Sequence, residues 1–130
     1  MKLRRPQTDG PEDVARQLPL TDLAFNILLS LADRDLHGYA LISEINERAP
    51  GGPRLRSGTL YAALRRLETV GLLRESGHRP APDQDDRRRR YYEILPLGLT
   101  VLRAEVDRLR GLLGVAQSKR LFGPPTGEFA

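Results

Sequence analysis

The stretch Ser57–Leu73, SGTLYAALRRLETVGLL, restricts the fold more than any other part of the chain. Three leucines recur at the i, i+4, i+7 spacing of one helical face: Leu60, Leu64 and Leu67. We expect Ser57 to be the N-cap, because its hydroxyl can accept a hydrogen bond from an amide of the first turn. Gly71 can adopt the left-handed conformation that ends many helices. The pattern predicts an amphipathic helix over about residues 57–70.

The face opposite the leucines carries small or basic residues: Gly58, Ala62, Arg65, Arg66 and Thr69. Such a face offers little to an apolar core, but it suits contact with a polyanion. We therefore interpret this helix as the recognition helix of a winged helix-turn-helix, in which such a helix lies in the DNA major groove. The sequence leaves open whether Arg65 and Arg66 reach base edges or phosphates.

Two further helices are predicted ahead of this one. The first covers about Thr21–Asp33, with its first residue as the N-cap, and the second covers about Tyr39–Ala49. A polar connection, Ala32–Gly38, joins them, and the sequence PGGP at residues 50–53 ends the second. A helix, a turn and a second helix with a small, basic outer face form a helix-turn-helix.

A wing is predicted after the recognition helix. Leu72–Glu75 and Arg90–Leu95 are predicted strands, and period-2 alternation turns Tyr92 and Ile94 towards the core. The loop between them ends in four consecutive arginines, Arg87–Arg90, placed to contact phosphates or to enter a minor groove. A run of charges on its own is more often a solvated face, and three nearby aspartates partly neutralise this one. Beside a basic recognition helix, we expect it to contact phosphates.

The last predicted helix begins at Pro96 and ends at about Leu121. Its apolar residues step by three and four, as in the seam of a short coiled coil: Leu99, Leu102, Val106, Leu109, Leu113 and Ala116. Charged residues such as Glu105 lie off this seam. In the predicted helix Thr21–Asp33, Phe25 and Leu29 lie off the apolar stripe, which predicts a second packing partner for that helix. The predicted dimer interface is Phe25, Leu29, Leu99, Leu102, Val106, Leu109 and Leu113. The alternative is an amphipathic helix folded onto its own domain.

The fold class is mainly α with a small β-wing: a winged helix-turn-helix followed by a long dimerisation helix. We expect an N-terminal tail over residues 1–19 that is partly disordered, a DNA-binding domain over 20–95, a dimerisation helix over 96–121 and a C-terminal tail over 122–130. A short helical turn at about Glu12–Leu18 fits the prolines at its ends. The alternative for the tail is a basic arm that reaches a DNA groove.

The length, charge and cysteine content of the chain agree with one small intracellular domain. The chain has 130 residues, a formal net charge of +4 and no cysteine, which excludes disulfides and thiolate metal sites. No apolar run approaches the roughly 20 residues of a membrane helix, and no signal-peptide pattern follows Met1. We expect a cytoplasmic protein without a membrane partner.

The residues of an enzyme are not present in this sequence. His37 and His78 are the only histidines, and no cysteine joins them at a metal or nucleophilic site. No glycine-rich phosphate-binding motif occurs. We expect no catalytic residue, no metal and no cofactor.

Several motifs between about Leu20 and Leu121 together resemble the PadR family of transcriptional regulators. The recognition helix is similar to that of the family in the sequences SGTLY at residues 57–61, LRRLE at 64–68 and GLL at 71–73. HGY at residues 37–39 resembles the start of the family's second helix, and RRYY at 89–92 resembles its second wing strand. A single C-terminal helix is similar to the shorter subgroup. The chain departs from the family at Leu95-Pro96, where a Thr N-cap is usual, and it has no Trp, which lines a drug-binding dimer pore in some members.

This resemblance implies a homodimer that binds an inverted-repeat operator in double-stranded DNA, usually as a repressor. We expect the DNA contacts to come from the recognition helix and the wing: Arg56, Ser57, Thr59, Tyr61, Ala62, Arg65, Arg66, Arg87, Arg88, Arg89 and Arg90. One version of this function adds a small apolar effector in a dimer cleft lined by Phe25, Leu29 and Leu102. The alternative function is a winged-helix protein-interaction module whose last helix pairs with another protein.

Overall fold

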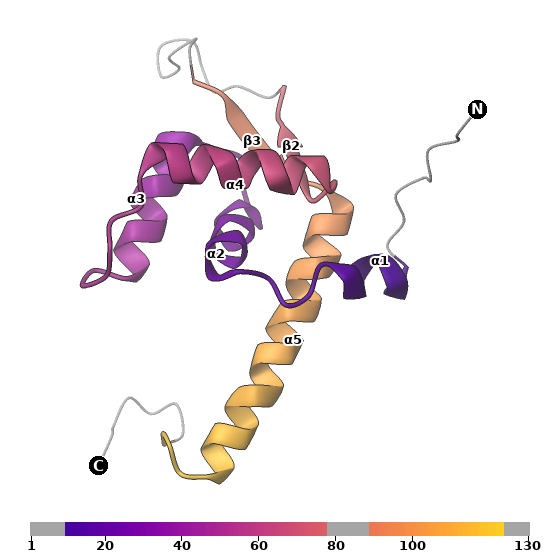
Figure 1. Cartoon of the computed structure of the whole chain (residues 1–130), viewed down its shortest axis with the longest axis vertical. Helices are drawn as coiled ribbons and strands as arrows, with labels where there is room; N and C mark the ends of the chain where they lie inside the picture. Colours follow the sequence, from indigo (N-terminus) through magenta and orange to yellow (C-terminus); the bar gives the residue numbers. More distant parts are fainter. Residues whose placement is uncertain (1–9, 78–88, 124–130) are drawn as a thin grey trace.

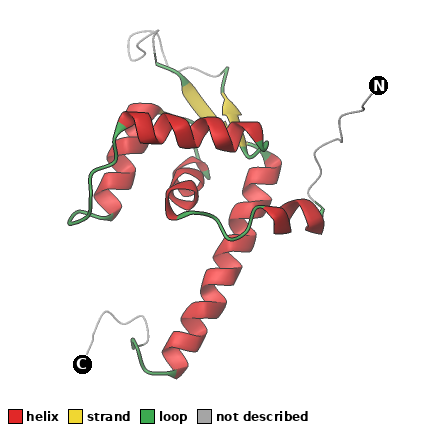
Figure 2. Ribbon diagram, in the orientation of Figure 1, coloured by secondary structure: helices red, strands yellow, loops and turns green. Residues whose placement is uncertain are grey.

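The computed structural model describes residues 10–77 and 89–123 (Figure 1). Its elements are α1 (Pro11–Arg16), α2 (Asp22–Leu31), β1 (Leu36–His37), α3 (Gly38–Arg48), α4 (Ser57–Thr69), β2 (Leu73–Glu75), β3 (Tyr91–Ile94) and α5 (Pro96–Ser118). The strands form an antiparallel sheet in the order β1-β3-β2. Helices make up most of the fold (Figure 2), which confirms the predicted class of a mainly α protein with a small β-wing.

The core is built around α2, which contacts α3, α4, α5 and β3. Ile27 and Leu28 are fully buried, and Leu31 is 2% exposed. The predicted α4 stripe packs in the same core with residues from β2 and α5: Leu60, Leu64, Leu67, Leu72, Leu73, Leu97, Val101 and Leu102. Full burial of one such side chain stabilises the fold by about 1.5–3 kcal/mol. The apolar periodicity of the sequence therefore identified the core.

Side chains fix the starts of α2 and α3. The hydroxyl of Thr21 accepts a hydrogen bond from the Ala24 amide at 3.1 Å, as predicted for the N-cap of α2. The Nδ1 atom of His37 accepts one from the Ala40 amide at 3.2 Å and caps α3. Both helices keep within about two residues of their predicted bounds, which is the usual uncertainty of helix ends.

The predicted N-cap of α4 is wrong. Arg56 is the N-cap, Ser57 is already the first helical residue, and no side chain caps this helix. The extended backbone of Arg56 places its carbonyl to accept the Leu60 amide at 3.0 Å, so the helix begins one residue earlier than the serine hydroxyl indicated. The amides of the first turn therefore lack a side-chain acceptor.

The predicted end of α4 is confirmed at Gly71, which has a φ of 81°. The amide of Leu72 donates to the Leu67 carbonyl at 3.0 Å, and the Gly71 amide donates to the Glu68 carbonyl at 3.1 Å. These are the two hydrogen bonds of a Schellman motif. Because the Leu72 amide is used in this cap, β2 begins at Leu73, one residue later than predicted.

Residues 36 and 37, expected in a polar connection, form β1 instead. Leu36 pairs with Tyr92 and His37 pairs with Tyr91, so β3 is the central strand of the sheet. A two-residue strand is too short for an alternation pattern to predict it. Strand β3 is one residue shorter at each end than predicted, but Tyr92 is 6% exposed and Ile94 packs against the core, as expected.

Helix α5 begins at Pro96, as predicted, and ends at Ser118 rather than at about Leu121. Arg120 adopts a left-handed φ of 61°, and the Leu121 amide donates to the Ala116 carbonyl at 3.0 Å. The left-handed Arg120 and this hydrogen bond end the helix, so residues 119–121 form its C-terminal cap.

The two halves of α5 differ in what they contact. Leu97, Val101 and Leu102 are at most 6% exposed and belong to the core, whereas the second half extends away from the other helices (Figure 1). Leu102, expected in a dimer interface, thus lies in the core of a single chain. Among the described residues, no helix combines the length and the apolar character needed to cross a membrane.

Gly98 allows α5 to approach the end of α4 closely. A Cβ atom here would lie 2.0 Å from the Leu72 carbonyl oxygen, a backbone atom that has little room to move. We expect Gly98→Ala to lower the free energy of unfolding by about 2–3 kcal/mol in a urea titration. Gly111→Ala on the same helix is the control, because nothing lies within 4 Å of a Cβ there. It should raise stability by about 0.5–1 kcal/mol, and equal effects in both variants would contradict the steric argument.

Glu105 of α5 is 2% exposed, although the helical pattern placed it among the charged residues off the seam. Its carboxylate accepts hydrogen bonds from the Leu20 amide at 3.0 Å and from Arg108 at 2.6 and 3.0 Å. The bond from Leu20 ties the segment before α2 to α5, and the bonds from Arg108 lie within α5. The sequence pattern missed this contact, because the Leu20 amide is 85 residues away along the chain.

The hydrogen bonds from Arg108 hold the pKa of Glu105 below its ordinary value of 4.5, against the opposing effect of burial. In the unfolded chain the pKa is ordinary, so Glu105 stabilises the fold above about pH 4.5 and loses this contribution as the pH falls through the lower folded-state pKa. We expect Glu105→Gln to be less stable at neutral pH by about 1–3 kcal/mol. Urea titrations between about pH 7 and about pH 3 should show the difference from wild type shrinking towards acid; a constant difference would be the contrary result.

Candidate nucleic-acid interface

The outer face of α4 is exposed and carries the small and basic residues expected from the sequence. Arg65 and Arg66 are exposed, and neither side chain makes a hydrogen bond or ion pair with another described residue. The predicted contact residues at the helix start are exposed as well: Arg56, Ser57 and Thr59. Ala62 is half-buried. The uncapped first turn adds the positive end of the helix dipole to these charges, so this face suits an anionic partner.

Arg65 and Arg66 lie on different flanks of α4. Arg65 lines a cleft of about 760 Å³ between α4 and the wing, together with Arg89 and Arg90. Arg66 lines a smaller cleft of about 200 Å³ beside the segment before α2, together with Thr21. Successive residues of a helix point about 100° apart, so Arg65 and Arg66 face different neighbouring elements. Arg65 therefore shares its flank with the wing, and Arg66 shares its flank with the N-terminal segment.

Tyr61 packs its ring against the start of α3. A Cβ atom on Gly38 would lie 2.2 Å from the Tyr61 hydroxyl oxygen, so the missing side chain of Gly38 lets α3 and α4 meet here. The ring is half-buried, as expected for a residue at the border of the apolar face. Contact between its hydroxyl and a phosphate stays a prediction.

Asn46 of α3 fixes the turn that leads into α4, and sequence reasoning missed it. It is 9% exposed, and its Oδ1 atom accepts a hydrogen bond from the Leu55 amide at 2.9 Å. Leu55 lies two residues before the start of α4, a helix without a side-chain cap. This bond therefore helps to set the direction of the recognition helix. A polar residue on the buried side of α3 was the available signal.

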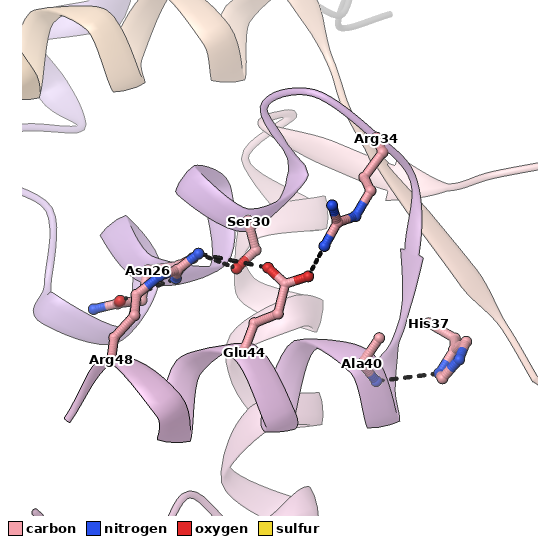
Figure 3. A network of polar contacts seen from close by, with 7 residues as sticks. All are labelled: Asn26, Ser30, Arg34, His37, Ala40, Glu44 and Arg48. Atoms are coloured by element: carbon pink, nitrogen blue, oxygen red, sulfur yellow. Dashed lines mark hydrogen bonds and ion pairs between the residues drawn. The ribbon is translucent and has the colours of Figure 1, made fainter. Parts of the chain in front are cut away.

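A polar network joins α2 to α3 behind the turn (Figure 3). Arg48 donates to the Ser30 hydroxyl at 2.8 Å and to the Asn26 carbonyl at 3.1 Å. Glu44 forms ion pairs with Arg48, at 3.6 Å, and with Arg34. Glu44 and Arg48 are four residues apart on α3, and Arg48 reaches α2. These bonds fix the position of α3 relative to α2.

The base of the wing brings two of its four predicted arginines next to α3. Arg89 and Arg90 are exposed, and Arg89 Nη1 lies 3.4 Å from His37 Nε2. The His37 ring meets Tyr91 edge to face, with 5.2 Å between centroids. Arg87 and Arg88 lie outside the described residues. Within the described ranges, no three acidic or histidine side chains come together as a metal site requires.

The predicted dimer residues have different surroundings within one chain. Phe25, Leu99, Val106 and Leu109 are half-buried, and Leu29 is 39% exposed. Leu113 is 56% exposed and has two equally exposed apolar neighbours, Leu112 and Val115. The second half of α5 therefore presents an apolar surface that the described part of the chain does not cover.

Helices α3 and α4 form a helix-turn-helix, strands β2 and β3 form a hairpin, and the outer face of α4 is exposed and basic. These features define a winged helix-turn-helix protein. The family model for the transcriptional regulator PadR-like family matches residues 27–104, which run from α2 into α5. The chain belongs to the PadR family, and the resemblance drawn from the recognition helix is confirmed.

Relatives support the same assignment. The transcriptional regulator Rv3488 of Mycobacterium tuberculosis is 36% identical over 103 residues, which cover 76% of this chain and 90% of that protein. An uncharacterized 37.1 kDa protein in transposon TN4556 of Streptomyces fradiae is 36% identical over 93 residues, and the chain spans only 24% of its length. The crystal structure of a PadR family transcription regulator from Clostridium difficile R20291 aligns with a TM-score of 0.62 at 25% identity, over 75% of this chain and 97% of that one.

Family membership makes this chain a transcriptional regulator, and regulators of this family are non-enzymatic DNA-binding proteins. The expectation that the chain is not an enzyme is thereby confirmed.

Proposed function

We propose that the chain acts as a homodimer that binds an inverted-repeat operator through α4 and the wing, and that it represses transcription there. The observation that carries this proposal is the placement of Arg65 and Arg66, without partners among the described residues, on the outer side of a helix whose inner side fills the core. A helix exposed in this way matches the element that lies in the major groove in related folds.

The helix start and the helix face have separate roles in this proposal. Ser57 and Thr59 suit phosphate contacts, because uncapped amides and the helix dipole favour anions at this end. Arg65 and Arg66 reach base edges or phosphates on the two flanks of α4. The remaining helix contacts are Arg56, Tyr61 and Ala62.

The wing supplies the sequence-independent part of the affinity. Arg89 and Arg90 lie at its base beside Arg65, where they suit phosphates or a minor groove. Arg87 and Arg88 belong to the same proposal, although they lie outside the described residues. Each phosphate that is neutralised releases counterions, which makes the affinity depend steeply on salt.

The dimer is proposed from the exposed apolar half of α5. Leu109 and Leu113 lie on the predicted seam, and the proposed interface also includes Phe25 and Leu29 of α2, which are half-buried and 39% exposed, respectively. A two-fold axis would place the two copies of α4 in successive major grooves about one helical turn apart, which matches an inverted repeat. Leu102 contributes to this interface only indirectly, because it already fills the core.

An apolar effector at this dimer cleft remains part of the proposal. It would contact Phe25 and Leu29 rather than Leu102, because Leu102 is 4% exposed in the single chain. The proposed location is the cytoplasm, because a transcriptional regulator acts where its DNA lies.

Selection of random duplex DNA by the purified protein, repeated across a salt series, tests the function. We expect a two-fold-symmetric site and an affinity that falls steeply as salt increases. Weak binding without sequence preference would overturn the repressor proposal. It would favour the second candidate, a winged-helix protein-interaction module, for which the exposed apolar half of α5 is the specific supporting observation.

A further inference from the structure

The cleft between α4 and the wing has the dimensions of a ligand site. Its volume is about 760 Å³, and residues of α3, α4, β2 and β3 line it. Clefts of roughly 300–1,000 Å³ are typical of small-molecule sites. Its position beside the recognition helix means that any occupant would lie next to the proposed DNA contacts.

Tyr92 lines this cleft from the central strand. The residue is 6% exposed, and its hydroxyl makes no hydrogen bond with any residue in the described ranges. Tyr92 lines the cleft together with Tyr61 and Glu75, and burial raises the pKa of Tyr92, which these two neighbours raise further. Buried polar groups in folded proteins are generally hydrogen-bonded. A ligand in the cleft can supply the hydrogen-bond partner that the described residues do not.

Charged side chains of both signs line the same cleft without pairing. Arg65 and Glu68 belong to α4, Glu75 ends β2, and Arg90 precedes β3. Across the described part of the chain, none of these four side chains has an ion pair or a side-chain hydrogen bond. All four side chains are exposed to solvent, so a ligand can reach them. They suit a ligand with an anionic group for the arginines and hydrogen-bond donors for the carboxylates.

Tyrosine rings form much of the remaining cleft lining. Tyr39 is 78% exposed at the start of α3, Tyr61 is half-buried on α4, and Tyr92 is 6% exposed on β3. Stacking between aromatic rings contributes about 0.5–1.5 kcal/mol beyond the buried area. This lining favours a planar ligand over an aliphatic one.

We propose that the cleft binds a small planar anion whose ring carries hydrogen-bond donors, which is the chemistry of a nucleotide, and that the bound ligand competes with DNA. The ring lies against the tyrosines, its donors meet Glu68 and Glu75, and its anionic group meets Arg65 and Arg90. The competition rests on the proposed function, because Arg65 and Arg90 are also proposed DNA contacts. This site is polar and lies apart from the apolar dimer surface.

Isothermal titration calorimetry of the full chain with AMP, GMP, CMP and UMP tests the binding site directly. Adenosine and inorganic phosphate are the two half-ligand probes. We expect at least one nucleotide to bind with a Kd below about 1 mM and more tightly than either half-ligand. The absence of binding by every nucleotide, or binding of phosphate alone with equal affinity, would overturn the proposal.

Tyr92→Phe removes only the buried hydroxyl, and we expect the Kd for the nucleotide to rise about five- to tenfold. Tyr91→Phe is the matched control, because Tyr91 is the neighbouring residue and does not line the cleft. It should change the Kd by less than about twofold, since no contact with the ligand is lost. An unchanged Kd in Tyr92→Phe would remove the basis of the site.

Gel shifts with the selected operator then test the competition. The nucleotide should raise the apparent Kd for DNA in proportion to its concentration, and Tyr92→Phe should need about five- to tenfold more nucleotide for the same shift. Bound nucleotide without any effect on DNA binding would overturn the competition. If the wild type recognised no operator at all, the proposed function would fail, whereas the calorimetry would still decide whether the cleft binds a nucleotide.

Discussion

The double variant Arg65→Ala/Arg66→Ala is expected to lose specific operator binding while it keeps its fold and its oligomeric state. Both side chains are exposed and make no side-chain bond within the described ranges, so their removal costs the fold little. Each well-formed contact from arginine to a base contributes about 1–3 kcal/mol of discrimination. Loss of two contacts should therefore raise the operator Kd by at least about thirtyfold, measured by gel shift at fixed salt.

The control for this variant removes the same charge elsewhere. Arg103→Ala/Arg110→Ala changes two exposed arginines of α5 and leaves α4 untouched. It should shift the Kd only through the lower net charge, an effect that disappears at high salt. The single variants Arg65→Ala and Arg66→Ala then compare how much the wing flank and the opposite flank of α4 contribute to the operator Kd, because the two arginines line different clefts. An operator Kd that the double variant leaves unchanged would show that α4 is not the recognition helix.

Leu113→Glu is expected to convert the proposed dimer to a monomer. Leu113 is 56% exposed within one chain, so a partner has apolar area to bury at this position. Loss of a buried leucine removes about 1.5–3 kcal/mol per copy, and two copies contribute to a two-fold interface. The dimer Kd should rise by at least two orders of magnitude, measured by sedimentation velocity over a concentration series.

Arg110→Glu is the control for this second variant. It places the same new carboxylate one turn earlier on α5, at an exposed residue outside the predicted seam. We expect it to sediment as the wild type does. Dimers that persist in Leu113→Glu would place the interface elsewhere and weaken the expected match to an inverted repeat.

The local features of this fold could be predicted from the sequence because their causes lie close together along the chain. Leu60, Leu64 and Leu67 define the buried side of α4 through helical spacing alone. Thr21 caps α2 through an amide three residues away, and Gly71 ends α4 within its own turn. Composition and periodicity were sufficient for these elements.

The features that sequence reasoning missed depend on contacts between distant segments. β1 exists because Leu36 meets Tyr92 on β3, and Glu105 is buried because the amide of Leu20 reaches its carboxylate. Neither contact leaves a periodic pattern. Ser57 was a wrong N-cap for a different reason: a suitable hydroxyl was present, but the backbone entered the helix one residue earlier.

The candidate site was predictable to a similar degree. The basic face of α4 followed from helical spacing, because residues opposite a buried stripe must be exposed. The separation of Arg65 from Arg66 required the neighbouring wing and N-terminal segment. The cleft itself was not predicted, because Tyr92 was assigned to the core and only the fold shows that it lines a cleft together with charged residues.

Strand β3 is paired on both sides, with β1 at its first two residues and with β2 at its last three. Arg89 and Arg90 directly precede this strand, so their backbone is anchored by the hydrogen bonds of the sheet. A cation on a disordered segment gives up backbone and side-chain entropy when it binds, whereas one beside a central strand gives up mainly the side-chain part, about 0.5–1.5 kcal/mol. The arginines at the base of the wing therefore lose less conformational entropy on binding than equally charged residues in a free tail would.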